Sequence, residues 1–117
     1  MEWDPLLYPR SRIAAACAKH KVVAIDGVWL NISDEDGLVA ETHAIKALGF
    51  RGKIAIHPKQ ISGIHAGFAP SENEIAYATK LVAAFEKAGG GAIKLDGKMI
   101  DLPLYESAQE TLAAAKD

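Results

Sequence analysis

The chain has 117 residues, of which 50% are hydrophobic and 24% are charged, and its formal net charge is −2 at pH 7. These values are those of an ordinary globular protein and exclude an intrinsically disordered chain. The near-neutral charge argues against a nucleic acid partner, and no stretch reaches the about 20 apolar residues of a membrane span, so we expect a cytoplasmic protein with no membrane partner.

The first half of the sequence alternates between helical and extended patterns. In chain order we expect a helix, a strand, a helix, a strand and a short helix, over residues 5–20, 22–30, 34–49, 53–57 and 59–66. Both predicted strands are apolar runs, which is typical of buried parallel strands covered on both faces. We therefore expect an α/β domain, with Arg10 and Arg12 on a solvated helix face.

The second half of the sequence has strong local signals for a different arrangement. Ser71 and Glu74 have the spacing of a capping box at the start of a helix, and the glycines at 89–91 end it. Two β-prone segments flank Asp96-Gly97, a pair of residues that favours a tight hairpin turn. A final helix begins near Pro103. We accordingly divide the chain into parts at 1–68 and 69–117.

The predicted strand at 53–57 ends in the most specific polar motif of the first half, His57-Pro58-Lys59-Gln60. Polar side chains that follow a parallel strand often face a ligand, because loops at that end vary over a rigid sheet. His57 is either a substrate neighbour or a hydrogen-bonded structural residue. Asp26 interrupts the other apolar run, and it is either a hydrogen-bonded acid at the end of the strand or a substrate contact.

Asp101 is the candidate acid of the second half. Its sequence neighbours Met99, Ile100 and Leu102 are apolar, and we expect them to enclose it. An apolar enclosure disfavours the charged form of a carboxylate, which suits such a group to proton transfer. The other interpretation is that Asp101 caps the helix that begins near Pro103.

Three segments of the chain together resemble a known family. They are AIDGVWLNISDEDG at 24–37, LGFRGKIAIHPKQI at 48–61 and GGGAIKLDGKMIDLP at 89–103. They resemble the C-terminal part of the citrate lyase β-subunit-like proteins of the HpcH/HpaI aldolase superfamily, which include malyl-CoA lyases and other CoA-ester lyases. The resemblance extends over about residues 5–115.

The resemblance implies a fold. Residues 1–68 would be the last βα units of a (β/α)₈ TIM barrel, and residues 69–117 a lid extension made of a helix, a β-hairpin and a helix. A barrel closes only with all its strands. Two parallel strands alone leave two unpaired edges and one uncovered apolar face, which invite association. We therefore expect an incomplete barrel that forms a homo-oligomer or needs the missing barrel half.

The resemblance also implies a function, the Mg²⁺-dependent cleavage or formation of a C–C bond in a 3-hydroxyacyl-CoA such as citryl-CoA or malyl-CoA. The partners would be a CoA thioester and an oxo acid, with Mg²⁺ polarising the oxo-acid oxygens. Asp101 would be the catalytic acid of the lid, and the substrate or CoA-binding residues would be Asp26, Lys53, His57, Pro58 and Gln60. The family's Mg²⁺ ligands lie upstream of the matched region, so we assign no metal ligand here. The alternative is a catalytically inactive fragment that acts as an interaction module.

Overall fold

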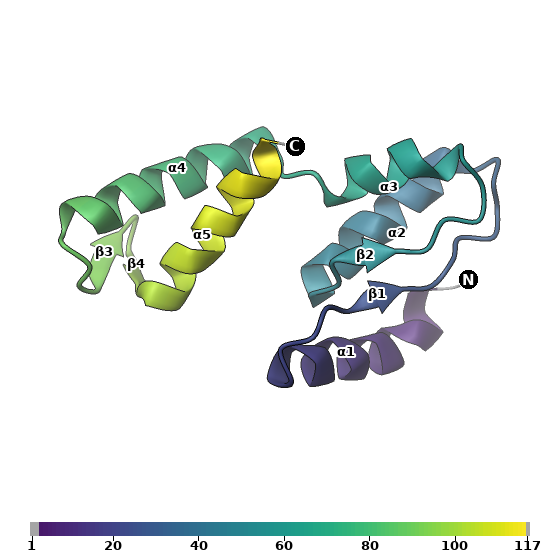
Figure 1. Cartoon of the computed structure of the whole chain (residues 1–117), viewed down its shortest axis with the longest axis horizontal. Helices are drawn as coiled ribbons and strands as arrows, with labels where there is room; N and C mark the ends of the chain where they lie inside the picture. The colour runs from purple at the N-terminus through teal and green to yellow at the C-terminus, as the bar shows by residue number, and fades with distance from the viewer. Residues whose placement is uncertain (1–2, 117) are drawn as a thin grey trace. The chain divides into compact units, whose positions relative to one another are not determined.

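A computed structural model describes residues 3–116 of the chain. The chain divides into two compact units, Met1–Phe68 and Ala69–Asp117, and each is described by itself (Figure 1). Both combine helices with short strands, so the predicted α/β class is confirmed. Among the described residues, no helix has both the length and the hydropathy that a membrane span requires.

The first unit alternates helix and strand in the predicted order. Its elements are α1 (Trp3–Lys19), β1 (Ile25–Asp26), α2 (Glu35–Leu48), β2 (Gly52–Lys53) and α3 (Gln60–Phe68). The two strands are parallel, with Ile25 opposite Gly52 and Asp26 opposite Lys53. Both ends of α2 are capped, because the Asp34 side chain accepts from the Gly37 amide and Gly49 has a left-handed φ of 113°.

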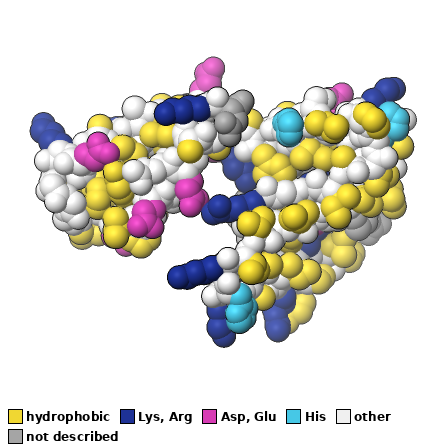
Figure 2. Space-filling view, viewed as in Figure 1, with side chains coloured by type: hydrophobic (Ala, Val, Ile, Leu, Met, Phe, Trp, Pro, Cys, Tyr) yellow, Lys and Arg dark blue, Asp and Glu magenta, His cyan; other side chains and the backbone are white. Residues whose placement is uncertain are grey.

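The predicted strands at 22–30 and 53–57 are too long. The apolar pattern predicts cover on both faces, which is wrong within this unit, whereas two strands alone are expected to leave one apolar face uncovered, as the structure has it. Each strand has two residues. Ile25 is 60% exposed and Ile54 is 52% exposed, whereas Ala24 between two exposed neighbours is buried. The helices of this unit cover one face of the strand pair, and no described segment of the unit covers the apolar side chains of the other face. Figure 2 shows hydrophobic side chains at the surface of this unit.

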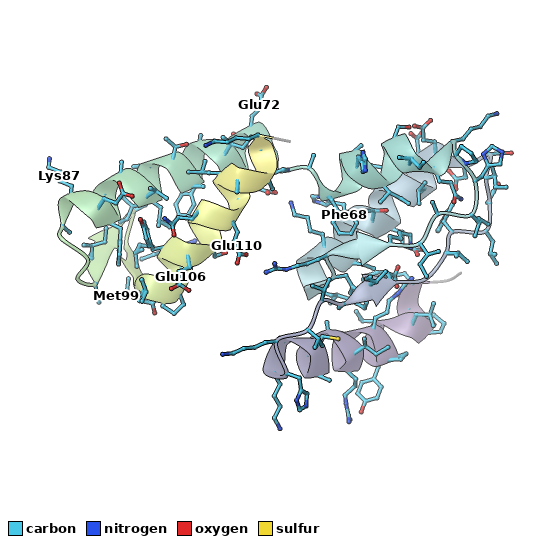
Figure 3. The ribbon with its side chains drawn as sticks, in the orientation of Figure 1. Phe68, Glu72, Lys87, Met99, Glu106 and Glu110 are labelled. Carbon is cyan, nitrogen blue, oxygen red and sulfur yellow. The ribbon has the colours of Figure 1, made fainter. Side chains whose placement is uncertain are left out.

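The core of the first unit lies between the strand pair and its helices. One cluster of buried apolar side chains consists of Ala14, Ala24, Ile45 and Phe50, and Leu38 and Ile64 are buried as well. Partly buried side chains pack around that cluster, from Trp3, Cys17, Leu48 and Phe68. Phe68, labelled in Figure 3, is the last residue of α3 and of the unit.

The second unit is a helix, a hairpin and a helix, as expected. It contains α4 (Glu72–Lys87), β3 (Ile93–Leu95), β4 (Lys98–Ile100) and α5 (Leu102–Ala115). The strands are antiparallel, and the turn residues Asp96 and Gly97 have φ values of 50° and 80°. A positive φ at both central residues is the geometry that an Asp-Gly pair favours in a hairpin turn.

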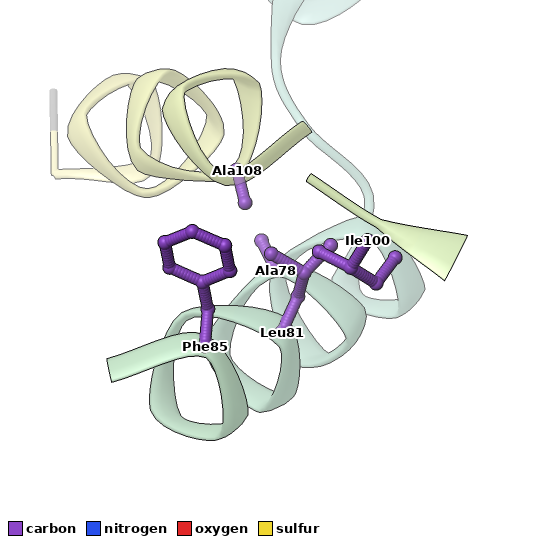
Figure 4. Close-up of a cluster of buried hydrophobic side chains, with 5 residues drawn as sticks. All are labelled: Ala78, Leu81, Phe85, Ile100 and Ala108. Carbon is purple, nitrogen blue, oxygen red and sulfur yellow. The ribbon is translucent and has the colours of Figure 1, made fainter. Parts of the chain in front are cut away.

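The second unit encloses an apolar core of its own. The buried side chains are those of Ala78, Leu81, Phe85, Ile100 and Ala108 (Figure 4). Phe85 also stacks on Tyr105 of the other helix, with 4.5 Å between ring centroids. α4 starts at Ser71, whose hydroxyl accepts from the Glu74 amide as the capping motif predicts. Local signals in the sequence thus specify this unit almost completely.

Candidate functional site

The strand pair of the first unit carries a buried cluster of four charged side chains. Asp26 and Lys53 are neighbours in the parallel register, and Lys53 Nζ lies 2.6 Å from Asp26 Oδ2 and 2.8 Å from Glu41 Oε1. Arg10 donates from Nε and Nη2 to the two oxygens of Asp26, at 3.0 and 3.1 Å. It also donates from Nη2 to Glu41 Oε1, at 2.8 Å.

Each charge of this cluster is neutralised inside the unit. The Lys53 side chain is 0% exposed and the Asp26 side chain 5%, so water contributes little to their solvation. A buried ion loses several kcal/mol of solvation, which only a close partner and hydrogen bonds restore. Asp26 is therefore the hydrogen-bonded acid that the sequence left as one of its two alternatives, and the contacts of Lys53 are with protein carboxylates. Their roles in substrate binding stay predictions.

Arg10 and Glu41 complete the cluster, and the sequence analysis missed both. The expectation that Arg10 lies on a solvated face is wrong, since the residue is buried. Its guanidinium also lies 5.4 Å from the centroid of the Trp3 ring. A signal was present, because Arg10 has helical spacing to Trp3 and Ala14, residues of the same apolar stripe. Glu41 likewise lies in the stripe that includes Leu38 and Ile45.

The loops after the two strands carry the His57-Pro58-Lys59-Gln60 motif and its neighbours. His57 is half-buried, and its Nδ1 accepts from the Lys59 amide at 3.1 Å. This bond assigns the proton of the neutral ring to Nε2. Pro58 and Lys59 are exposed. The structure therefore gives His57 a local structural contact, and its place beside a substrate stays a prediction.

Gln60 differs from the rest of that motif because its side chain is buried. Its Oε1 accepts from the Ile56 amide at 2.9 Å, and its Nε2 donates to the Trp29 carbonyl oxygen at 2.7 Å. The two backbone groups belong to different loops, one after β1 and one after β2. The amide thus joins the two loops through both of its ends.

Asp101 lies in the second unit, at the junction of β4 and α5. Its Oδ1 accepts from the Leu104 amide at 3.2 Å, so the residue is the N-cap of α5. The expected apolar enclosure is wrong, because Asp101 is exposed and Met99, labelled in Figure 3, is 69% exposed. Side chains alternate along a strand, so Ile100 enters the core while Met99 points outward, and Leu102 at the start of α5 is 55% exposed. The role of Asp101 in proton transfer stays a prediction.

The phenol of Tyr105, in the second unit, has a pKa shifted from its ordinary value. Its hydroxyl donates to Glu86 Oε1 at 2.8 Å and accepts from Gln109 Nε2 at 2.9 Å. The hydrogen bond to the Glu86 carboxylate raises the pKa of Tyr105 above its ordinary value of 10.0. The contact joins α4 to α5 and adds to the stacking of Tyr105 on Phe85.

The described residues do not fit a magnesium ion. Among residues 3–116, no three or more His, Cys, Asp or Glu side chains are grouped so that they could hold a metal. The two buried carboxylates of the first unit, Asp26 and Glu41, are already bound to Arg10 and Lys53. Magnesium prefers carboxylate oxygens and water in octahedral geometry, and two cations at the same oxygens oppose its entry.

The sequence matches the HpcH/HpaI aldolase/citrate lyase family over residues 2–58. It is 38% identical over 113 residues to the mitochondrial citramalyl-CoA lyase of Rattus norvegicus, over 94% of this chain and 33% of that protein. It is 40% identical over 113 residues to citrate lyase subunit beta of Leuconostoc mesenteroides subsp. cremoris, over 94% of this chain and 37% of that protein. The chain therefore spans about a third of the length of these curated relatives.

A solved structure gives the same relationship. The chain is similar to protein CitE from Mycobacterium tuberculosis, with a TM-score of 0.85 and 32% sequence identity. The similarity covers 100% of this chain and 43% of that one. The crystal structure of CitE is a complex with magnesium, acetoacetate and coenzyme A.

Proposed function

Because the chain belongs to the HpcH/HpaI aldolase/citrate lyase family of CoA-ester lyases, we propose that it is the C-terminal segment of a Mg²⁺-dependent lyase of this kind. The substrate is a 3-hydroxyacyl-CoA with a carboxylate beyond the hydroxyl, as in citryl-CoA or malyl-CoA. The products are an oxo acid and a shorter acyl-CoA. Two relatives that are named as lyases align with 94% of this chain. A structurally similar protein was solved as a complex with coenzyme A. Both findings support the proposal.

The observation that carries the proposal is the unfinished strand pair of the first unit. Helices cover one face of β1 and β2, while the apolar side chains of the other face, such as Ile25 and Ile54, are exposed. This is the arrangement expected of the last βα units of a TIM barrel, whose strands bury both faces once the barrel closes. In this proposal residues 1–68 are that barrel portion and residues 69–117 are a lid.

The cleavage step needs one proton removed and one proton supplied. Loss of the proton of the 3-hydroxyl turns C3 into the carbonyl carbon of the oxo acid. The electron pair of the C2–C3 bond moves to C2 and forms the enolate of the shorter acyl-CoA. In the proposal Asp101 supplies the proton that C2 then takes up, and in the reverse direction it removes that proton. Its exposed position at the start of α5 leaves its second oxygen accessible for this exchange.

The missing barrel half would hold the magnesium ion, because residues 3–116 offer no fitting set of ligands. The remaining barrel strands would come from a second copy of the chain or from a separate polypeptide. The partners in the proposal are thus a CoA thioester, an oxo acid and the missing barrel half. A cytoplasmic location stays a prediction.

Reconstitution tests the proposal. The chain is mixed with the part of the Leuconostoc citrate lyase subunit beta that precedes the matched region, and release of acyl-CoA from citryl-CoA and malyl-CoA is followed with and without Mg²⁺. We expect Mg²⁺-dependent release in the mixture that the Asp101→Asn chain does not support. Absence of release from the chain alone, from any homo-oligomer and from the mixture would leave the interaction module as the better account.

A further inference from the structure

Gln60 holds together the loops that follow the two strands of the first unit. These loops, residues 27–33 and 54–59, leave β1 and β2 in the same direction because the strands are parallel (Figure 1). Gln60 is 2% exposed, although it is the first residue of α3 and Lys59 beside it is exposed. A buried polar side chain at such a position needs partners for both ends of its amide.

The two hydrogen bonds of Gln60 have opposite polarity. Oε1 accepts from the Ile56 amide in the loop after β2, and Nε2 donates to the Trp29 carbonyl in the loop after β1. A carboxylate in place of the amide could accept from Ile56 but could not donate to Trp29, and an apolar side chain could do neither. The bridge therefore depends on the amide and not on the size of the side chain.

Trp29 connects the Gln60 hydrogen bonds to the start of helix α2. Its indole Nε1 donates to the Asp34 carbonyl at 3.1 Å, and Asp34 is the N-cap of α2. The ring also lies over Gly37 in the first turn, where an added Cβ would come within 2.6 Å of it. The loop after β1 is thus held through two groups of Trp29, whose backbone carbonyl is bound by Gln60 and whose indole is bound by the start of α2.

We infer that Gln60 is a positioning residue, which sets the separation and orientation of the two loops at the ligand end of the sheet. This inference rests on the proposed function, since it takes these loops to lie beside the acyl-CoA. It replaces a direct substrate contact of Gln60, because both ends of the buried amide are already bound to backbone groups. The substrate would instead meet the exposed loop residues that Gln60 holds in place, such as Pro58 and Lys59.

Two substitutions separate the ends of the bridge. Gln60→Glu keeps the acceptor for Ile56 and loses the donor to Trp29, whereas Gln60→Leu loses both. Ile45→Val is the matched control, because it thins the core of the same unit without touching either loop. All variants also carry Trp3→Phe, which leaves Trp29 as the single tryptophan of the chain.

The readouts are amide exchange at Ile56, the fluorescence of Trp29 and the affinity for acetyl-CoA. We expect Gln60→Leu to speed exchange at Ile56 by about tenfold, since the amide loses its one side-chain acceptor, and Gln60→Glu to leave that exchange unchanged. Both variants should shift the Trp29 emission toward that of a solvated indole and weaken acetyl-CoA binding by about tenfold. The Ile45→Val control should do none of these things.

Each other result decides the matter. If both Gln60 variants match the Ile45→Val control in exchange and fluorescence, the bridge does not hold the loops and the inference is wrong. If the loops loosen but acetyl-CoA binds as tightly as before, Gln60 does not position them for the ligand, and the inference is again wrong. If the unsubstituted protein binds no acetyl-CoA, alone or reconstituted, the proposed function fails, and exchange and fluorescence still decide whether the bridge exists.

Discussion

The two units of this chain differ in which side chains they bury and which they leave exposed. The first unit, Met1–Phe68, buries four charged side chains against one face of its strands and leaves apolar side chains exposed on the other face. The second unit, Ala69–Asp117, encloses an apolar core and has an ion pair at its surface, between Lys80 and Asp96. The apolar core of the second unit is thus enclosed by residues of that unit, whereas one apolar face of the strand pair in the first unit is covered by no described residue of that unit.

The largest expected effect is on stability, and it comes from comparing substitutions at two lysines, one in each unit. Lys53→Met removes a fully buried cation and leaves Asp26 and Glu41 with one guanidinium between them. Breaking such a buried pair costs about 3–5 kcal/mol of unfolding free energy. Lys80→Met, the matched control, breaks a pair with more than half of each side chain exposed and should cost at most about 1 kcal/mol.

Urea denaturation gives the free energy of unfolding of each variant, and amide exchange gives the protection of each unit separately. Lys53→Met should lower protection throughout α1 and α2 and leave α4 and α5 as before. Equal losses from the two variants would contradict the account, because burial and not charge alone is what separates the two pairs.

Asp101 offers the second test, on activity. Asp101→Asn keeps the oxygen that accepts from the Leu104 amide, so the cap should lose about 1 kcal/mol or less of stability. An amide cannot exchange a proton, so lyase turnover in a reconstituted enzyme should fall by about 10²–10⁴-fold. Turnover and the melting temperature are measured on the same preparation. Unchanged turnover would leave Asp101 as a helix cap and nothing more.

The smallest effect concerns the phenol of the second unit. The hydrogen bond to Glu86 raises the pKa of Tyr105 above 10.0 in the folded chain, whereas the unfolded chain loses this proton near the ordinary value. The contribution to stability is therefore complete below pH 10 and is lost as the pH rises through the folded pKa. Glu86→Gln should lower the pKa of Tyr105, as seen in the ultraviolet absorbance of tyrosinate. A titration identical to that of the unsubstituted chain would remove Glu86 as the cause.

Much of the fold follows from local chemistry, and the second unit shows how far that reaches. The cap at Ser71, the turn at Asp96-Gly97 and the start of α5 each depend on a few adjacent residues, and all three were predictable. The caps of α2 belong to the same class. The end residues of these elements carry their own signal, since each satisfies backbone groups within a few positions.

The rest depended on contacts between distant positions. An apolar strand pattern predicts burial but does not say whether the cover comes from the same chain, so the pattern alone does not tell which face holds the exposed Ile25 and Ile54. Arg10 is buried because Asp26 lies 16 positions away in the chain and beside it in the fold. Asp101 was expected among apolar neighbours, yet alternation along β4 turns Met99 outward and Leu102 at the start of α5 is exposed as well. None of these outcomes follows from neighbours in the sequence.

The central claim is that the exposed face of the strand pair is an interface, and sedimentation of the chain tests it most directly. We expect the unsubstituted chain to associate at micromolar concentration, and we expect Ile25→Lys to weaken that association. Ile25 is 60% exposed, so the substitution should change the stability of the unit itself by about 0.5 kcal/mol or less. A compact, cooperatively melting monomer that sediments identically with and without Ile25→Lys would contradict the claim.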